Sequence, residues 1–324
     1  MSLYRRIGRR IALGAVAGWA VLTIVFLLLT QTRDTNLGGL IGGAMIGAAF
    51  AGKSPEEMAT QRDEIRRQYL AERNLDGPFL ENYVHWMVDM VTLRWGHSIE
   101  TGDLVTSLVF ESVLRTAAYV LPAMVLAVTI GITLGVYAAL RRGSRGETAG
   151  RLTTYLLFGL PNFWIGSLVL VLLGIPVSVG DGSVLSEHLL PVALLTTTLL
   201  AGQVSYARSE SMEYVSAAFV KLLRAKGASD WRVARHVLRT AAIPLISLFF
   251  TEMLAVLVLS VFVLEYLFGI DGFGMVLYDA VNARDLPVVL GCTLVVIVVG
   301  VLGNVVQDVG YSVLDPRVDT GSRR

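Results

Sequence analysis

The sequence predicts an all-α membrane protein with six transmembrane helices. Hydrophobic residues make up 54% of its 324 residues and charged residues only 16%, and its mean hydropathy is +0.63. Soluble globular domains are less apolar and carry more charge, so this composition excludes one. Six apolar runs reach or approach the roughly 20 residues that cross a bilayer. Arginine and lysine are concentrated in alternate loops between these runs, as in multi-pass proteins.

The six predicted spans follow from these apolar runs. The first resembles a signal peptide because arginines precede it, but it is longer than a typical signal sequence and lacks a convincing cleavage site, so it is interpreted as an anchor. The predicted spans are residues 11–30, 117–140, 154–179, 189–207, 241–268 and 286–309.

The loop charges predict the orientation of the chain. Four arginines precede the first span, four lie at residues 141–151, and seven arginines or lysines lie at residues 208–239. The intervening loops at residues 180–188 and 269–285 are mainly acidic. By the positive-inside rule, both termini and the basic segment after the fourth span are cytoplasmic, in a cell (inner) membrane.

The segment between the first two spans, residues 31–115, is therefore predicted to be an extracytoplasmic helical cap. Its glycine-rich run at residues 38–52 is too short to span comfortably, and glycine disfavours helix, so an interfacial or packed segment is expected. A helix is predicted over 54–75, with Pro55 at its start and two glutamates in its first turn. An amphipathic helix is predicted over 79–93.

Residues 47–54 match the P-loop pattern GxxxxGK[ST], with Gly47, Gly52, Lys53 and Ser54 at the defining positions. A P-loop joins a buried strand to a helix whose N–H groups bind phosphates. Here the preceding residues are glycine-rich, and Pro55 removes an N–H where the phosphates would bind. The match is interpreted as coincidental, and no cofactor is expected on this chain.

The second half of the chain contains one basic polar stretch, the hairpin segment at residues 211–244. Apolar residues at helical spacing predict a first helix, which Gly227 ends, and Ser229 or Asp230 can cap a second. The segment is interpreted as a helix, a glycine turn and a second helix at a membrane surface, and its simplest role is an amphipathic loop on lipid headgroups. A DNA-reading helix-turn-helix is disfavoured because both ends run into membrane-length segments, so no nucleic-acid partner is expected.

Polar residues within spans are costly and are therefore candidate substrate-path residues. Glu252 either faces a path for a cationic group or is protonated and hydrogen-bonded in the bundle. Asn162 and Trp164 follow Pro161, which should kink the third span. Gln203 is a further candidate, although interhelical hydrogen bonding is the simpler role. The four histidines have no metal-ligand spacing and no catalytic constellation is found, so neither a metal site nor an enzyme is predicted.

Several motifs resemble those of one family. The segment FVKLLRAKGASDWRVARHVLRTAAIPLI is similar to the cytoplasmic EAA loop of ABC importer permeases of the dipeptide, oligopeptide and nickel type. GITLGVYAALRRGS, GLPNFWIG, LEYLFGIDGFG and VQDVGYSVLDPRV resemble further motifs of that family, in the same order along nearly the whole chain. Residues 221–223 depart from the letters that name the EAA motif, and Asp271 replaces a usual proline. The run at residues 38–52 has no counterpart among the family's motifs. The resemblance therefore implies least about the cap and about how a binding protein would dock there.

The resemblance implies a transport subunit and not an enzyme. Its partners would be a homologous second permease, two ATPase subunits that use ATP and Mg, and an extracytoplasmic solute-binding protein, all assembled at the lipid bilayer. The expected parts are residues 1–30 (N-terminus and first span), 31–115 (cap), 116–311 (permease core with a coupling loop at 208–240) and 312–324 (cytoplasmic tail). The ATPase contact would comprise Arg224, Ala225, Lys226, Gly227, Ala228 and Ser229.

Two other classes of membrane protein are less consistent with the sequence. A secondary transporter or channel would need ion-coupling residues and often internal repeats, and neither is found. A membrane-embedded enzyme or sensor would need paired acids or catalytic histidines in its spans. The transported solute is not determined by these residues: peptide, nickel and sugar all fit the resemblance.

Overall fold

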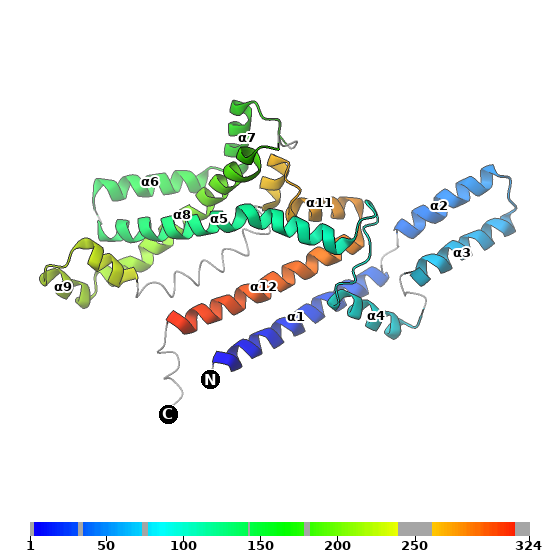
Figure 1. The fold of residues 1–324 in the computed structure, drawn as a ribbon, viewed down its shortest axis with the longest axis horizontal. Coiled ribbons are helices and arrows are strands. Elements are labelled where there is room, and N and C mark those ends of the chain that lie inside the picture. Colours follow the sequence, from blue (N-terminus) through cyan, green and yellow to red (C-terminus); the bar gives the residue numbers. More distant parts are fainter. Residues whose placement is uncertain are drawn as a thin grey trace. The chain divides into compact units, whose positions relative to one another are not determined.

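The computed structural model describes residues 3–31, 35–72, 77–141, 143–177, 182–238 and 261–314, and its regular elements are helices. The chain forms two compact units (Figure 1). The smaller contains residues 12–97, and the larger contains residues 98–324 together with the first eleven residues.

The smaller unit is built on α1 (Leu3–Gln31), the first predicted span. Phe26 of α1 is buried and lies against three aromatic rings of α4 (Phe79–Val91), with centroid distances of 5.1 to 5.7 Å. Thr23 and Tyr83 share a hydrogen bond of 2.8 Å between the same two helices. The apolar face predicted for residues 79–93 therefore packs on the first span.

The glycine-rich run forms a helix, contrary to expectation: α2 covers Thr35–Phe50 and contacts α3, Pro55–Glu72. Helix propensity is a weak prior, and the alanine, leucine and isoleucine residues between the glycines favour helix. α3 confirms the helix predicted to start at Pro55. Ser54 and Glu57 exchange hydrogen bonds in a capping box, with Ser54 N–H donating to Glu57 over 2.7 Å.

The larger unit contains the remaining helices, and α5 and α8 form its centre. A π-helical turn precedes α8. The bounds are α5 Val105–Leu140, α6 Arg145–Gly159, α7 Asn162–Leu173, the π turn Leu185–Leu189, α8 Leu190–Val215, α9 Ala218–Ala225, a helix at 230–238, a helix at Val261–Phe268, α11 Phe273–Ala283 and α12 Leu286–Leu314.

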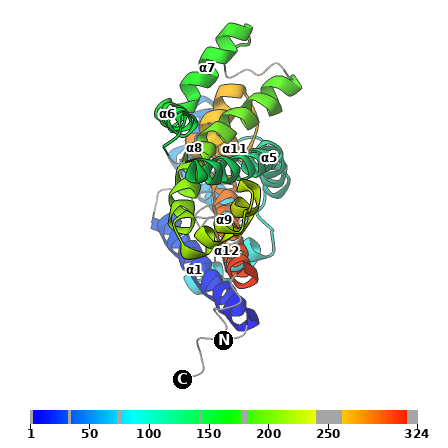
Figure 2. The ribbon, with the colours of Figure 1, turned by 90° about the vertical axis from the view of Figure 1, so that its left-hand side faces the viewer.

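α5 and α8 lie side by side along much of their length (Figures 1 and 2). Their backbones approach closely at Gly131 and Gly135 of α5. A Cβ atom at Gly131 would lie 2.6 Å from the Gln203 Cβ, and one at Gly135 would lie 2.5 Å from the Ala207 Cβ. The GxxxG pair on the second span thus packs against another helix, as small-residue pairs in membrane helices do.

The main hydrophobic core lies where α5, α7, α8 and the Val261–Phe268 helix meet. Its largest fully buried side chains include Tyr119, Leu170, Leu195, Leu264 and Phe268. These residues come from four different helices, so the core fixes the centre of the larger unit.

Four helices of the described residues are long and apolar enough to span a membrane: Ile7–Leu28, Val105–Leu140, Leu185–Val215 and Leu286–Val306. Val261–Phe268 and α11, bent by 87°, would together make a fifth. The span predicted over 154–179, with a kink at Pro161, is divided at that proline: α6 ends at Gly159 and α7 begins at Asn162, because proline cannot donate in a helix interior. Most of the predicted fifth span and the predicted tail lie outside the described residues.

Candidate functional site

The predicted basic hairpin is formed by α9, a tight turn and the helix at 230–238. Gly227 ends α9 with a left-handed φ of +73°, which glycine adopts without steric cost. Its N–H donates to the Arg224 carbonyl over 3.0 Å, and the Ala228 N–H donates to the Leu223 carbonyl over 3.0 Å. This pair of bonds is a Schellman motif, which satisfies the carbonyls that a helix end leaves unpaired.

The base of the hairpin is apolar and is attached to two long helices. Val220 of α9 and Val233 and Val237 of the second helix are buried. Leu140, the last residue of α5, and Tyr214 near the end of α8 pack against these valines. The hairpin is therefore held on the ends of both α5 and α8, at one end of the unit (Figure 1).

The tip of the hairpin is exposed and combines positive charge with large apolar side chains. Trp231 is 77% exposed and Leu222 is 56% exposed. Five of the six predicted contact residues are exposed and Ala228 is half-buried. Tryptophan and arginine are enriched among the residues that contribute most to protein–protein binding. The tip thus has the chemistry of a protein-docking surface, and Figure 2 looks onto this end of the unit.

The loop between α5 and α6 adds polar attachments at the same end. Glu147, on α6, is 7% exposed and forms an ion pair with Arg208 of α8. Its other carboxylate oxygen accepts from the Gly143 N–H over 2.7 Å, and its own N–H donates to Ser144, the N-cap. Arg141 pairs with Asp230 at 3.1 Å in a more exposed setting.

The candidate substrate-path residues lie in different surroundings. Asn162, at the start of α7, donates a hydrogen bond to Thr198 of α8, and Trp164 is 54% exposed. Gln203 is fully buried at the crossing of α5 and α8. Thr198 and Gln203 are five residues apart on α8, so their side chains point about 140° apart. Glu252 lies outside the described residues, and the path assignment stays a prediction.

The P-loop match lies between two helices. Gly47 is within α2, and Lys53 donates to Gln61 of α3 over 3.0 Å. The Ser54 N–H is bonded to the Glu57 carboxylate, and this bond lowers the pKa of the Glu57 carboxyl. An acidic side chain therefore occupies a backbone donor that a P-loop would offer to phosphate, which supports the interpretation as a coincidence.

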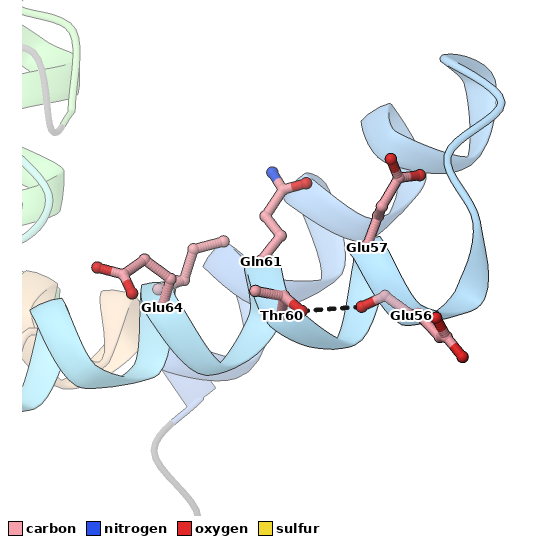
Figure 3. Close-up of a pocket in the computed structure, with 6 residues that line it drawn as sticks. Glu56, Glu57, Thr60, Gln61 and Glu64 are labelled. Carbon is pink, nitrogen blue, oxygen red and sulfur yellow. Dashed lines mark hydrogen bonds between the residues drawn. The ribbon is translucent and has the colours of Figure 1, made fainter.

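A shallow pocket on α3 is lined by residues with several acidic side chains (Figure 3). Its labelled glutamates, Glu56, Glu57 and Glu64, point in different directions. Thr60 donates to the Glu56 carbonyl over 3.0 Å within the helix. The glutamates do not converge on a point, so the pocket offers no evident ligand position.

Sequence reasoning assigned no role to Glu265, which is fully buried in the structure. Its carboxylate accepts hydrogen bonds from Thr116 at 2.5 Å and Tyr119 at 2.9 Å, both on α5. It also accepts from the Met275 N–H over 2.8 Å, at the start of α11. An acidic residue in an otherwise apolar run was the available signal, and LEYLFGIDGFG had been noted only as a motif.

A second buried carboxylate holds the segment before α5. Asp285, 2% exposed, accepts from the Ser98 hydroxyl at 2.5 Å and from the Ile99 N–H at 2.9 Å. It lies one residue before α12 and 187 positions from Ser98. The carboxylate therefore anchors the start of the larger unit to the start of its last helix.

Comparison with known proteins gives a consistent family. The model of the binding-protein-dependent transport system inner membrane component matches residues 131–320. The oligopeptide transport system permease protein AppB of Bacillus subtilis is 30% identical over 78% of this chain and 85% of its own length. The metal-staphylopine import system permease protein CntB of Staphylococcus aureus is 27% identical over 80% of this chain and 85% of its own length.

A putative peptide permease protein of Brucella ovis is 29% identical over 95% of this chain and 96% of its own length. The similarity thus covers both the helices of the larger unit and most of the smaller one. The motifs, the helical membrane architecture and the family match agree, and the chain belongs to the inner membrane components of binding-protein-dependent transport systems, as an ABC importer permease of the dipeptide, oligopeptide and nickel type.

Proposed function

We propose that this permease forms half of the translocation path of an ATP-driven importer and is driven by separate ATPase subunits through the hairpin of α9 and residues 230–238. A homologous second permease supplies the other half, and an extracytoplasmic binding protein delivers the solute. The ATPase subunits bind and hydrolyse ATP with Mg, and their closure moves the helices between inward- and outward-facing states. The cargo is a peptide or a similar small solute, since relatives carry names of peptide and metal-chelate importers.

The construction of the hairpin carries this proposal. Its base is buried against α5 and α8, whereas its tip exposes Trp231, Leu222 and the cations Arg224 and Lys226. A lipid-facing amphipathic loop would place its apolar side chains together on one face and its cations on the other. α9 separates its apolar and basic side chains in this way too, so a partner contact is favoured instead by the buried attachment of the hairpin to α5 and α8 and by the Schellman turn that joins its two helices.

The test is a bulky substitution at the turn. Gly227→Trp places a large side chain where the partner would sit, in a left-handed conformation that costs an L-residue about 1–2 kcal/mol. A Cβ there meets nothing within 4 Å in this chain, so membrane insertion is retained. We expect loss of stimulated ATP hydrolysis in vesicles that contain the complete importer.

Gly174→Trp is the matched control. Gly174 ends α7 with a φ of +70° and also has nothing within 4 Å of an added Cβ, so the backbone cost is the same. The control should keep stimulated hydrolysis. Wild-type stimulation in Gly227→Trp, or failure of the native chain to co-purify with any ATPase subunit, would refute the proposed function.

A further inference from the structure

The helix α5 contacts two regions that the proposed function needs to connect. Its last residue, Leu140, packs into the base of the hairpin, and Arg141 directly after it pairs with Asp230. Near its other end, Thr116 and Tyr119 bind Glu265 of the bent helix pair Val261–Phe268 and α11. With 36 residues, α5 spans about 54 Å at 1.5 Å per residue, more than the hydrocarbon core.

The contact of α5 with the bent pair is a closed ring of hydrogen bonds around one carboxylate. Thr116 donates to Glu265 and accepts from the Phe273 N–H over 2.8 Å. Tyr119 donates to the same carboxylate oxygen, and the Met275 N–H donates to the other. All three side chains are less than 9% exposed, so water does not compete for these bonds.

The backbone of the bent pair is shaped to this ring. A Cβ at Gly272 would lie 2.1 Å from the Glu265 Oε1 atom, and one at Gly274 would lie 2.8 Å from the Phe262 Cα. Only glycine allows the chain to turn so closely over the carboxylate. Arg115 adds a contact from α5, donating to the Asp271 carbonyl over 3.4 Å. The turn at 269–272 and the start of α11 are therefore attached to α5 and to Glu265 together.

Between its two ends, α5 is supported by α8. Gly131 and Gly135 bring the two backbones together toward the hairpin end. Pro122 lies inside α5 and removes one helix hydrogen bond. Next to it, the Ala123 carbonyl accepts a hydrogen bond from Thr196 of α8 over 3.4 Å. The position most prone to bending is thus braced by the neighbouring helix.

We propose that α5 is the mechanical link between the hairpin and the bent helix pair, and that Glu265 is the positioning residue through which α5 moves that pair. This inference rests on the proposed function, because it takes the hairpin to be where ATPase movement enters. Displacement of the hairpin shifts the end of α5, and the Glu265 ring transmits the shift to the turn at 269–272. Two discrete arrangements of such packed elements are the usual basis of coupling between distant sites.

The test must distinguish loss of the contact between α5 and the bent pair from misfolding of the bent pair itself. Glu265→Ala would remove the three hydrogen bonds that Glu265 accepts and could prevent folding. The double variant Thr116→Val, Tyr119→Phe preserves side-chain shape and removes only the bonds from α5. Glu265 keeps the Met275 N–H bond within the bent pair. Thr133→Val is the matched control, because this exposed threonine also lies on α5 and donates to the Thr129 carbonyl of its own helix.

The readout is movement of the bent pair in response to nucleotide. Cys292, the only cysteine, is replaced by alanine, and Asn282→Cys places a thiol at an exposed position of α11. The rate of labelling by a water-soluble maleimide is measured in the complete importer with and without ATP and vanadate. In the double variant we expect the nucleotide-induced change in rate to fall by about tenfold, a size typical of coupling between distant sites. Thr133→Val should keep the full response.

Basal ATP hydrolysis and co-purification of the ATPase subunits are measured on the same samples. The link is supported if both stay at the native level while the labelling response is lost. A full labelling response in the double variant overturns the proposed link. A reduced response that is accompanied by equally reduced thermal stability and basal hydrolysis overturns it as well. If the native chain binds no ATPase, the proposed function has failed; if the native response is present and the double variant matches it, only the link has failed.

Discussion

At the residue scale, Gly135 sets the distance between α5 and α8. A Cβ added there would lie 2.5 Å from the Ala207 Cβ and 2.9 Å from two backbone atoms, the Arg208 nitrogen and the Val204 oxygen. Side chains can rotate away from such a contact, but backbone atoms of a packed helix cannot. The helices would therefore have to separate to accept even one methyl group.

Gly135→Ala should accordingly destabilise the protein by about 1–3 kcal/mol, the usual cost of overpacking. Gly150→Ala in α6 is the control, because nothing lies within 4 Å of its added Cβ. The control should be neutral or stabilise by up to about 1 kcal/mol through helix propensity. Cys292 is buried, so its reaction with a thiol-specific dye on heating in detergent reports unfolding. An unchanged midpoint for Gly135→Ala would contradict the close packing.

The hydrogen-bond partners of Glu265 could not be predicted from the sequence. Glu265 was visible as a carboxylate in an apolar run, but its partners Thr116 and Tyr119 lie 149 and 146 residues away. Nothing local indicates which hydroxyl groups a buried carboxylate will meet. By contrast, Gly227 was predicted as a helix stop from local sequence alone, and its Schellman bonds join residues within five positions.

At the element scale, two ion pairs of different strength lie near the hairpin. Glu147 of α6 pairs with Arg208 of α8, and Arg141, directly after α5, pairs with Asp230 of the second hairpin helix. The Glu147–Arg208 pair has side-chain exposures of 7% and 24%, whereas the Arg141–Asp230 pair has exposures of 55% and 60%. Solvent screens the second pair and leaves the first comparatively dry. The attachment of α6 to α8 should therefore depend mainly on Glu147.

Glu147→Ala should lower stability by about 1–3 kcal/mol, because it leaves the Gly143 N–H and the half-buried Arg208 without that acceptor. Asp230→Asn, at the exposed pair, should change stability by no more than about 1 kcal/mol. Detergent-solubilised thermal midpoints compare the two. Equal effects would mean that burial does not set the strength of these pairs.

Elements with strong local signals were predicted well, and those determined by packing were not. The α3 helix starts at Pro55 as its proline and glutamates indicated, and α12 starts at the predicted Leu286. The glycine-rich α2 was expected not to be helical, and the third span was expected to be kinked at Pro161 but not divided there. A hydropathy profile does not show how helices pack on one another. The packing of α7 on α8 decides that Pro161 separates α6 from α7.

At the scale of the whole molecule, the alternation of charged loops predicts which side each segment faces. The loop at 141–151 is basic and is predicted to face the cytoplasm, whereas α3 lies in the predicted extracytoplasmic cap. This assignment follows from charge and not from the coordinates. The same prediction would place the hairpin on the side of the proposed ATPase and the Glu265 ring on the opposite side.

Single cysteines in a Cys292→Ala background test this orientation. Asp63→Cys on α3 and Ala149→Cys on α6 are both at exposed positions. A membrane-impermeant maleimide should label Asp63→Cys in intact cells and should reach Ala149→Cys only after permeabilisation. The reverse pattern would invert the topology and remove the basis for an ATPase contact at the hairpin.

The Schellman turn at the hairpin tip has a consequence for how partners are chosen. The turn closes on its own backbone bonds, between Gly227 and Arg224 and between Ala228 and Leu223, so its shape does not depend on what docks there. A preformed tip loses little conformational freedom on binding. Exposed side chains such as Leu222 and Trp231 can therefore change while the turn keeps its geometry. If the hairpin binds an ATPase as proposed, a change of ATPase partner would therefore involve these exposed side chains and not the backbone of the turn.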